Sequence, residues 1–410
     1  MLFPEAADLS EADRRWRKSK RMKKYYLGID TSNYTTSVAA VSGDGKILFD
    51  RRQVLRVREG ERGLRQSQAL FEHICNLPEV ISGLNEAVKA EGYVLGGVGV
   101  STRPRPVEGS YMPCFRAGEA AAKVLAEAEG APLVETSHQE GHLAAALKTD
   151  CEVPEAPKES LIDVEEADSP MTEGVKGMCA APLEDDCRLR EADGRPGGEF
   201  IAFHLSGGTT EALLCKPCKE GGFEIEIIGG TDDISFGQLI DRVGVSLGMT
   251  FPCGREVDRL ALEREKSRNT GEGAGASPSQ KKEKGKKGEK NPFCKIKSAD
   301  CHMNISGIET QVQRFIKNPE EEAEPKAVCA WVLDRVGEAL KTAADQARKM
   351  TGRKKVLLMG GVSSSGYIRK MLEGDDNLVF GKPELCSDNA VGVALICAEA
   401  CEGQACGQKR

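Results

Sequence analysis

A strand–turn–strand pattern occurs twice in this chain, and it constrains the fold more than any other feature. Residues 25–40 read YYLGIDTSNYTTSVAA, and residues 200–214 read FIAFHLSGGTTEALL. Each segment places apolar and β-branched residues on both sides of a small polar turn, which is the pattern of two paired strands. The recurrence indicates an internal repeat.

Helix and strand patterns alternate along the rest of the chain. Short apolar runs predict strands at 96–101, 132–135 and 355–359, and amphipathic periodicity predicts helices at 115–129, at 327–350 and from Asn389 onward. A chain of 410 residues is more typical of two domains than of one. The sequence therefore predicts an α/β protein with two lobes.

Two low-complexity segments interrupt the pattern. Residues 151–199 carry 14 acidic and 5 basic side chains, and residues 264–297 are rich in lysine and glycine, so neither can pack a core. We therefore expect seven parts along the chain. They are a basic N-terminal extension (1–24), an N-terminal lobe with a metal-binding histidine pair, His138 and His142 (25–150), an acidic insertion (151–199), the start of the second lobe (200–263), a flexible insertion (264–297), the remainder of the second lobe with a closing helix (298–400) and a tail (401–410).

Composition argues for a cytoplasmic protein with no membrane segment. No apolar run reaches eighteen residues, and the polar, basic start lacks the apolar stretch of a secretory signal. The 15 cysteines are scattered and odd in number, which favours reduced thiols. The formal charge of −7 is concentrated in the acidic insertion, whose own net is −9, so the rest is close to +2. Basic runs at 14–24, 51–65 and 281–290 are solvated tails or loops, or contacts for phosphate.

Three turns that each follow a strand carry glycine or small hydroxyl residues. They are Asp30 to Ser32, Ser206 to Thr210, and Gly360 to Ser363. Backbone N–H groups in such turns suit the phosphates and sugar of a nucleotide, although a Gly-Gly pair after a strand is often only a tight turn.

The segment HQEGH places His138 and His142 four residues apart, so that on a helix both imidazoles point to one side and can share a metal ion. The metalloprotease motif HExxH has its glutamate directly after the first histidine. Glu140 instead projects about 200° away from the shared face, so the general base of a protease is missing. Asp388 is either a third ligand or the cap of the closing helix, and two imidazoles with a carboxylate suit iron or zinc.

These motifs, in order, resemble the tRNA N6-adenosine threonylcarbamoyltransferases, formerly described as sialoglycoprotein endopeptidases. The similarity runs from about residue 25 to residue 400. It is carried by LGIDTS (27–32), HQEGH (138–142), LSGGT (205–209), Asp232 and Asp233 with Gly237 and Asp241, FPCG (251–254), SGIET (306–310), GGV (360–362) and SDNA (387–390).

The resemblance implies a two-lobed actin-like ATPase fold of the ribonuclease H-like class, with His138, His142 and Asp388 on one divalent metal ion, iron rather than zinc. Positions that match the substrate- and nucleotide-binding residues of the family are His204, Leu205, Ser206, Gly207, Gly208, Asp241, Gly254, Asp258 and Ser365. The implied reaction moves a threonylcarbamoyl group from threonylcarbamoyl-adenylate to N6 of the adenosine next to a tRNA anticodon, and releases AMP. ATP is the other adenine nucleotide that such a site would take. The implied partners are tRNA and family-type subunits, including a paralogue of the same fold. No catalytic side chain is identified.

The chain departs from the family in four loops. The family's TSCDET is TSNYTT at residues 31–36, its Gly-Pro-Gly-Leu loop is RPRPVEGS at 103–110, and its histidine and asparagine after two Gly-Gly pairs are Thr209 and Ser365. Arg103 and Arg105 either bind a phosphate or carboxylate or lie in a solvated loop. Three alternatives therefore stand beside the tRNA transferase: a carbamoyltransferase for another substrate, an actin-like kinase with Asp30 or Asp241 as base, and a non-catalytic binding subunit.

Overall fold

The computed structural model describes residues 23–32, 34–57, 64–148, 198–218, 221–270, 291–318 and 324–407. Residues 1–22 of the N-terminal extension, nearly all of the acidic insertion and residues 271–290 of the lysine-rich insertion lie outside the described residues. The chain divides into two compact units. Unit 1 comprises Met1–Leu55, Ala69–Gly141 and Asn389–Arg410, and unit 2 comprises Arg56–Gln68 and His142–Asp388.

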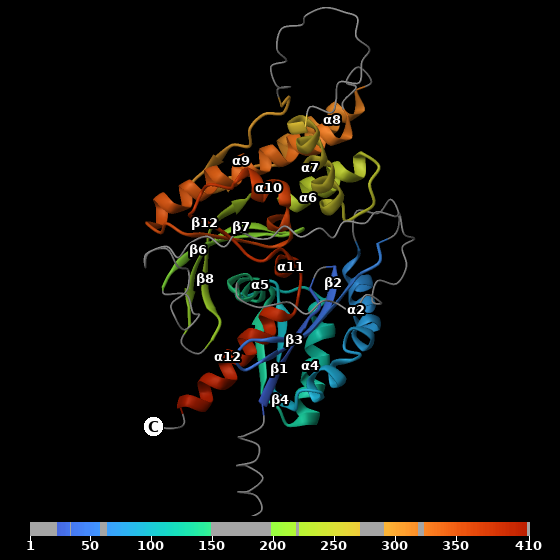
Figure 1. Cartoon of the computed structure of the whole chain (residues 1–410), viewed down its shortest axis with the longest axis vertical. Coiled ribbons are helices and arrows are strands. Elements are labelled where there is room, and N and C mark those ends of the chain that lie inside the picture. Colours follow the sequence, from blue (N-terminus) through green and yellow to red (C-terminus); the bar gives the residue numbers. More distant parts are fainter. Residues whose placement is uncertain are drawn as a thin grey trace, which may run out of the picture. The chain divides into compact units, whose positions relative to one another are not determined.

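The described strands of unit 1 form one five-stranded sheet in the order β3-β2-β1-β4-β5. Strands β1 to β4 are labelled in Figure 1. Strands β1 to β3 pair antiparallel as a meander, whereas β4 and β5 run parallel to β1. The strands are β1 (Lys23–Asp30), β2 (Thr35–Ser42), β3 (Ile47–Val54), β4 (Tyr93–Arg103) and β5 (Leu133–Ser137). The helices are α2 (Gln66–Val80), α3 (Leu84–Lys89), α4 (Phe115–Glu129) and α12 (Val391–Gly407).

Alternation along β1 gives the two faces of this sheet different partners. Leu27 and Ile29 join a buried apolar cluster that includes Ala122 of α4. Gly28, between them, faces the other way, and a Cβ built on it would lie 2.3 Å from the carbonyl oxygen of Ala390. Glycine here lets the first turn of α12 approach the sheet backbone closely.

The sheet of unit 2 repeats this arrangement. Its order is β12-β11-β6-β7-β8-β10-β9, with β6 to β8 antiparallel and β11 and β12 parallel to β6. The strands are β6 (Phe200–Leu205), β7 (Thr210–Pro217), β8 (Phe223–Thr231), β9 (Ser298–Ala299), β10 (His302–Met303), β11 (Val356–Met359) and β12 (Leu378–Phe380).

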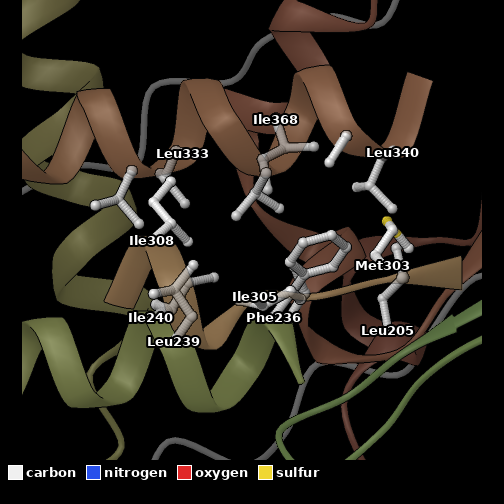
Figure 2. Close-up of a cluster of buried hydrophobic side chains, with 14 of the residues drawn as sticks. Leu205, Phe236, Leu239, Ile240, Met303, Ile305, Ile308, Leu333, Leu340 and Ile368 are labelled. Atoms are coloured by element: carbon white, nitrogen blue, oxygen red, sulfur yellow. The ribbon is translucent and has the colours of Figure 1, made fainter. Parts of the chain in front are cut away.

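Helices cover both faces of the unit 2 sheet. One face packs on a large cluster in which Leu205, Phe236, Leu239, Ile308 and Leu333 meet (Figure 2). The helices of this unit are α6 (Phe236–Ser246), α7 (Gly254–Thr270), α8 (Ser306–Lys317), α9 (Pro325–Thr351), the 3-10 turn η1 (Gly361–Ser364), α10 (Gly366–Met371) and α11 (Pro383–Cys386). The other face carries Phe200 and Ala202, which pack on Leu143, Ala146 and Leu147 of α5 (His138–Leu147).

The predicted internal repeat is thus confirmed, because the five-strand arrangement of unit 1 recurs in unit 2, where β10 and β9 are added beyond β8. A meander of three strands followed by two strands parallel to the first, present twice, is the actin-like ATPase fold of the ribonuclease H-like class that the resemblance implied. No helix among the described residues is both long enough and apolar enough to cross a lipid bilayer.

One expectation about the chain's division is corrected. Sequence order assigned the closing helix to the second lobe, within residues 298–400, but α12 contacts β1, β2 and β4 and belongs to unit 1. The reason is physical, because the glycine-lined face of the first sheet has no other described helix to cover it.

Candidate functional site

Helix α5 fixes the relative positions of His138 and His142, as the spacing predicted. Its first turn is closed by a capping box: the Ser137 hydroxyl accepts from the Glu140 N–H at 3.2 Å, while Glu140 Oε2 accepts from the Ser137 N–H at 2.9 Å. Thr136 also donates to Glu140 Oε2, at 3.1 Å. Glu140 therefore serves the helix end, which agrees with its exclusion as a protease base.

Three side chains of unit 2 that could bind a metal ion, His142, Asp388 and His204, lie close together. The Nε2 atom of His142 lies 3.3 Å from Oδ1 of Asp388, and the ring centroid of His142 lies 4.9 Å from that of His204. His204 follows Phe200 and Ala202 at strand period, so it points to the same sheet face, the one that α5 covers. The alternative role of Asp388 as a helix cap is filled by its neighbour, because Asn389 Oδ1 accepts from the Val391 N–H at 3.0 Å.

In unit 1, His138 contacts a buried carboxylate at the end of β1. Its Nδ1 lies 3.0 Å from Oδ2 of Asp30, which also accepts from the Ser32 hydroxyl at 2.7 Å, and Ser101 donates to Oδ1. Burial acts to raise the pKa of the Asp30 carboxyl, but the charge and hydrogen bond of His138, with the two hydroxyls, outweigh it and hold the pKa below its ordinary value.

The donor set fits a divalent transition metal. His138 and His142 lie four residues apart on α5, and within unit 2 His142 lies beside His204 and Asp388. His142 Nε2 and Asp388 Oδ1 lie 3.3 Å apart. A direct hydrogen bond allows this separation, and so do two ligands of one tetrahedral metal ion, which are about 3.4 Å apart given metal–nitrogen bonds of about 2.1 Å. Three imidazoles and a carboxylate are ligands that iron and zinc both accept.

The sequence placed His204 among the substrate- and nucleotide-binding positions, and in the structure its ring lies beside that of His142. The signal was present in the alternation of FIAFHL, where His204 shares a face with Phe200 and Ala202. The sequence did not show that α5 is the helix that covers this face of β6.

The two glycine-rich turns of unit 2 lie against each other at the ends of neighbouring parallel strands. Met359 of β11 is in register with His204 of β6, and a Cβ on Gly360, whose φ is +92°, would lie 2.5 Å from the carbonyl oxygen of Leu205. Gly207 and Gly208 are exposed at the tip of the first turn. Carboxyl ends of adjacent parallel strands are where α/β sheets bind ligands.

Helix α6 begins on this turn. The Ser235 hydroxyl donates to the Gly207 carbonyl at 2.8 Å, and a Cβ on Gly237 would lie 2.5 Å from the Ser206 carbonyl oxygen, so α6 approaches the turn backbone directly. Asp241 follows Gly237 by one helical turn and accepts from the Cys253 N–H at 2.8 Å, next to Gly254. Burial raises the pKa of Asp241, which that N–H partly opposes.

Asp258 and Ser365, distant in sequence, are direct partners. The Ser365 hydroxyl donates to Asp258 Oδ1, and the N–H groups of Gly366 and Tyr367 donate to the same carboxylate at 3.0 Å each. Asp258 therefore holds the N-terminus of α10, and with it the segment that follows the Gly360 turn.

The two remodelled loops of unit 1 are tied down by hydrogen bonds. Thr31 donates to the Cys114 carbonyl at 3.0 Å and accepts from the Gly118 N–H at 3.0 Å, so this hydroxyl serves the start of α4. The Pro104 carbonyl accepts from the Gln139 N–H at 3.1 Å, which joins the Arg103 loop to the first turn of α5. That loop, from Arg103 to Ser110, lines a hollow of about 300 Å³.

Comparison with known proteins places these features in a family. The family model described as "tRNA N6-adenosine threonylcarbamoyltransferase" matches residues 192–395, about half of the chain. A protein of that name from Neorickettsia sennetsu is 26% identical over 381 residues, 91% of this chain and 92% of the relative. One from Geobacillus kaustophilus is 27% identical over 384 residues, 90% of each chain.

Among solved structures, the activator of 2-hydroxyisocaproyl-CoA dehydratase from Clostridium difficile, with bound ADPNP, is similar at a TM-score of 0.42 and 12% identity, covering 95% of this chain and 98% of that one.

The matched family span contains the Ser206 turn, Asp241, Asp258, Ser365 and Asp388, and the curated relatives align with nine-tenths of the chain. Together with the repeated sheet and the histidine pair of α5, these matches lead to one conclusion: the chain belongs to the tRNA N6-adenosine threonylcarbamoyltransferase family.

Proposed function

We propose that this chain transfers a threonylcarbamoyl group from threonylcarbamoyl-adenylate to N6 of the adenosine next to the anticodon of tRNA, with His138, His142 and Asp388, joined by His204, holding one divalent metal ion. The observation that carries the proposal is the meeting of His142, Asp388 and His204 at the end of β6, the strand that leads directly into the Ser206 turn. His204, a proposed metal ligand, is thereby two residues before Ser206, where the proposed nucleotide turn begins.

The division of labour follows from what each group can donate or accept. The metal ion, when bound, supplies a Lewis acid for the oxygens of the adenylate. The N–H groups of the exposed Gly207–Gly208 turn suit its phosphate, and Asp241 and the Asp258–Ser365 pair suit hydroxyl and amine groups of the nucleoside. Preorganised donors of this kind stabilise charge that develops during acyl transfer.

The kinase alternative finds less support. A kinase needs a carboxylate that can accept the proton of the attacking hydroxyl. Asp30 is fully buried and engaged by His138, Ser32 and Ser101, and Asp241 accepts from the Cys253 N–H. Neither is placed as an open base.

A carbamoyltransferase for another substrate and a non-catalytic binding subunit are the remaining candidates. Both are favoured by the basic Arg103 loop, which replaces a glycine-rich one beside the start of α5. Cytoplasmic location, the choice of iron over zinc and assembly with family-type partner subunits belong to the proposal as well.

The decisive experiment supplies purified protein of known metal content with threonylcarbamoyl-adenylate and unmodified tRNA, and measures the modified nucleoside after digestion. Wild type is expected to form product, and His138→Ala and His204→Phe are expected to lose both metal and at least about 100-fold of the rate, because each removes a ligand. His302→Ala is the matched control, since His302 is exposed and bonds Asp232 far along the chain from these donors.

Bound metal without product, even when candidate partner subunits are added, would reject the tRNA reaction. Product formed equally well by His204→Phe would show that His204 is not a metal ligand and would leave the rest of the proposal unchanged.

A further inference from the structure

The end of β1 carries a buried carboxylate that is not among the proposed metal ligands. Asp30 has 0% of its surface exposed. Strands β1, β4 and β5 are parallel neighbours, with Ile29 in register with Val100 and Arg103 with Ser137. Their carboxyl ends therefore bring Asp30, Ser101 and His138 together, each from a different strand end.

The hydrogen bonds around Asp30 determine which hydrogen positions are possible. An ionised carboxylate only accepts, so the group that faces it must donate. Ser32 and Ser101 donate through their hydroxyls, one to each oxygen. The ring nitrogen of His138 at 3.0 Å from Oδ2 is Nδ1, so Nδ1 must carry a hydrogen.

We propose that Asp30 is a positioning residue that holds the His138 ring in its Nδ1–H tautomer and so presents the Nε2 lone pair to the metal. The inference rests on the proposed metal site and deepens it. Neutral imidazole has one donor and one acceptor nitrogen, so fixing the hydrogen on Nδ1 leaves Nε2 as the ligand. A carboxylate behind a ligating histidine also fixes the ring orientation and raises its basicity.

The same unit contains a histidine whose partner exerts no such control. His73 Nδ1 lies 2.8 Å from the hydroxyl of Thr36, and a hydroxyl can either donate or accept. Thr36→Val therefore removes a buried side-chain hydrogen bond to a histidine of unit 1 without touching the Asp30 network. It is the matched control for the substitutions at Asp30.

The direct test observes the tautomer in metal-free protein. With ¹⁵N-labelled histidine, and the His138 signals assigned by their loss in His138→Gln, wild type is expected to show His138 protonated at Nδ1. In Asp30→Asn the amide can face Nδ1 with its oxygen or with its NH₂, so Nδ1–H is no longer enforced and a mixture of the two tautomers is expected. Wild-type His138 found as the Nε2–H form would overturn the inference.

The second readout is metal affinity, measured with Zn²⁺ and Co²⁺ against a chromophoric chelator. Asp30→Asn is expected to weaken binding by about 10- to 100-fold, the usual range for losing a partner behind a ligand. Ser101→Ala keeps the carboxylate and removes one hydroxyl, so a smaller loss is expected, and Thr36→Val is expected to bind as wild type does. Ser101→Ala also keeps the test open if Asp30→Asn does not fold.

The outcomes separate this inference from the proposed function. Unchanged affinity and an unchanged tautomer in Asp30→Asn overturn the role of Asp30 and leave the transferase intact. Wild type that binds metal, with His138 in the Nδ1–H form, but transfers nothing to tRNA overturns the transferase and supports the role of Asp30.

Discussion

At the scale of the residue, position in a strand or helix turn decides the role more than residue type does. His204 and His302 are both histidines in the sheet of unit 2, yet His204 is buried beside His142, while His302 is exposed and bonds Asp232. Asp30 and Asp388 also differ by position: Asp30 contacts Nδ1 of His138, whereas Asp388 contacts Nε2 of His142.

The carboxyl of Asp241 should reveal a conflict between stability and ligand binding. Its pKa is raised by burial, so its contribution to stability is full below the ordinary carboxyl pKa of about 3.9 and is lost as the pH rises through the folded-state value. At neutral pH the buried charge is therefore a cost. Asp241→Asn is expected to raise the urea midpoint at pH 7.5, to leave it nearly unchanged near pH 3.5, and to weaken AMP binding.

Asp232→Asn, which removes an exposed carboxylate close in sequence, controls for the loss of one charge. A stability gain of the same size at both pH values would contradict the argument.

At the scale of the element, several residues of the candidate site lie at helix ends. Ser137 and Glu140 close the start of α5, which carries both histidines, and Asp258 holds the start of α10 behind the Gly360 turn. Helix ends leave N–H groups that need partners, so the same side chains set the helix start and the position of the neighbouring loop.

Substitution of Asp258 should therefore act on α10 as a unit. Asp258→Ala removes the acceptor for the Gly366 and Tyr367 N–H groups and is expected to lower the free energy of unfolding by about 1–2 kcal/mol. Urea titration measures this. Asp258→Asn keeps one acceptor oxygen and is expected to lose less, so equal losses in the two variants would show that the cap is not the cause.

At the scale of the whole molecule, the end of the chain completes the unit that the beginning starts. Helix α12 packs on the sheet formed by β1, β2 and β4, where glycines such as Gly28 and Gly99 leave room for its backbone. Unit 1 is therefore not a continuous segment, and its folding requires a contact across nearly the full length of the sequence.

Adding one methyl group at that contact tests this closure. In Gly28→Ala the new Cβ would lie 2.3 Å from the Ala390 carbonyl oxygen, so the helix must move and a loss of about 1–3 kcal/mol is expected in urea unfolding. Gly403 lies on α12 itself, and a Cβ built on it would have no neighbouring atom within 4 Å outside the helix's own backbone. Gly403→Ala is therefore expected to be neutral or to stabilise the helix by up to about 1 kcal/mol. A Gly28→Ala protein as stable as wild type would mean that α12 is not held this closely.

Local structure and part of the candidate site could be predicted from the sequence alone. Period-two and period-3.6 patterns placed β1, β2, β6, β7, α4 and α9 nearly at their observed bounds, and the HQEGH spacing put His138 and His142 on one helix, because such patterns arise from burying one face of an element.

Which elements pack together could be learned only from the folded chain. That α12 returns to the first sheet, that α5 covers the face of β6 which carries His204, that Asp258 meets Ser365, and that Asp30 stands behind His138 are all contacts between residues far apart in the chain. The periodicity of a segment shows which of its faces is buried. It does not show which element covers that face, because strand order and helix packing are set by the cooperative burial of the whole core.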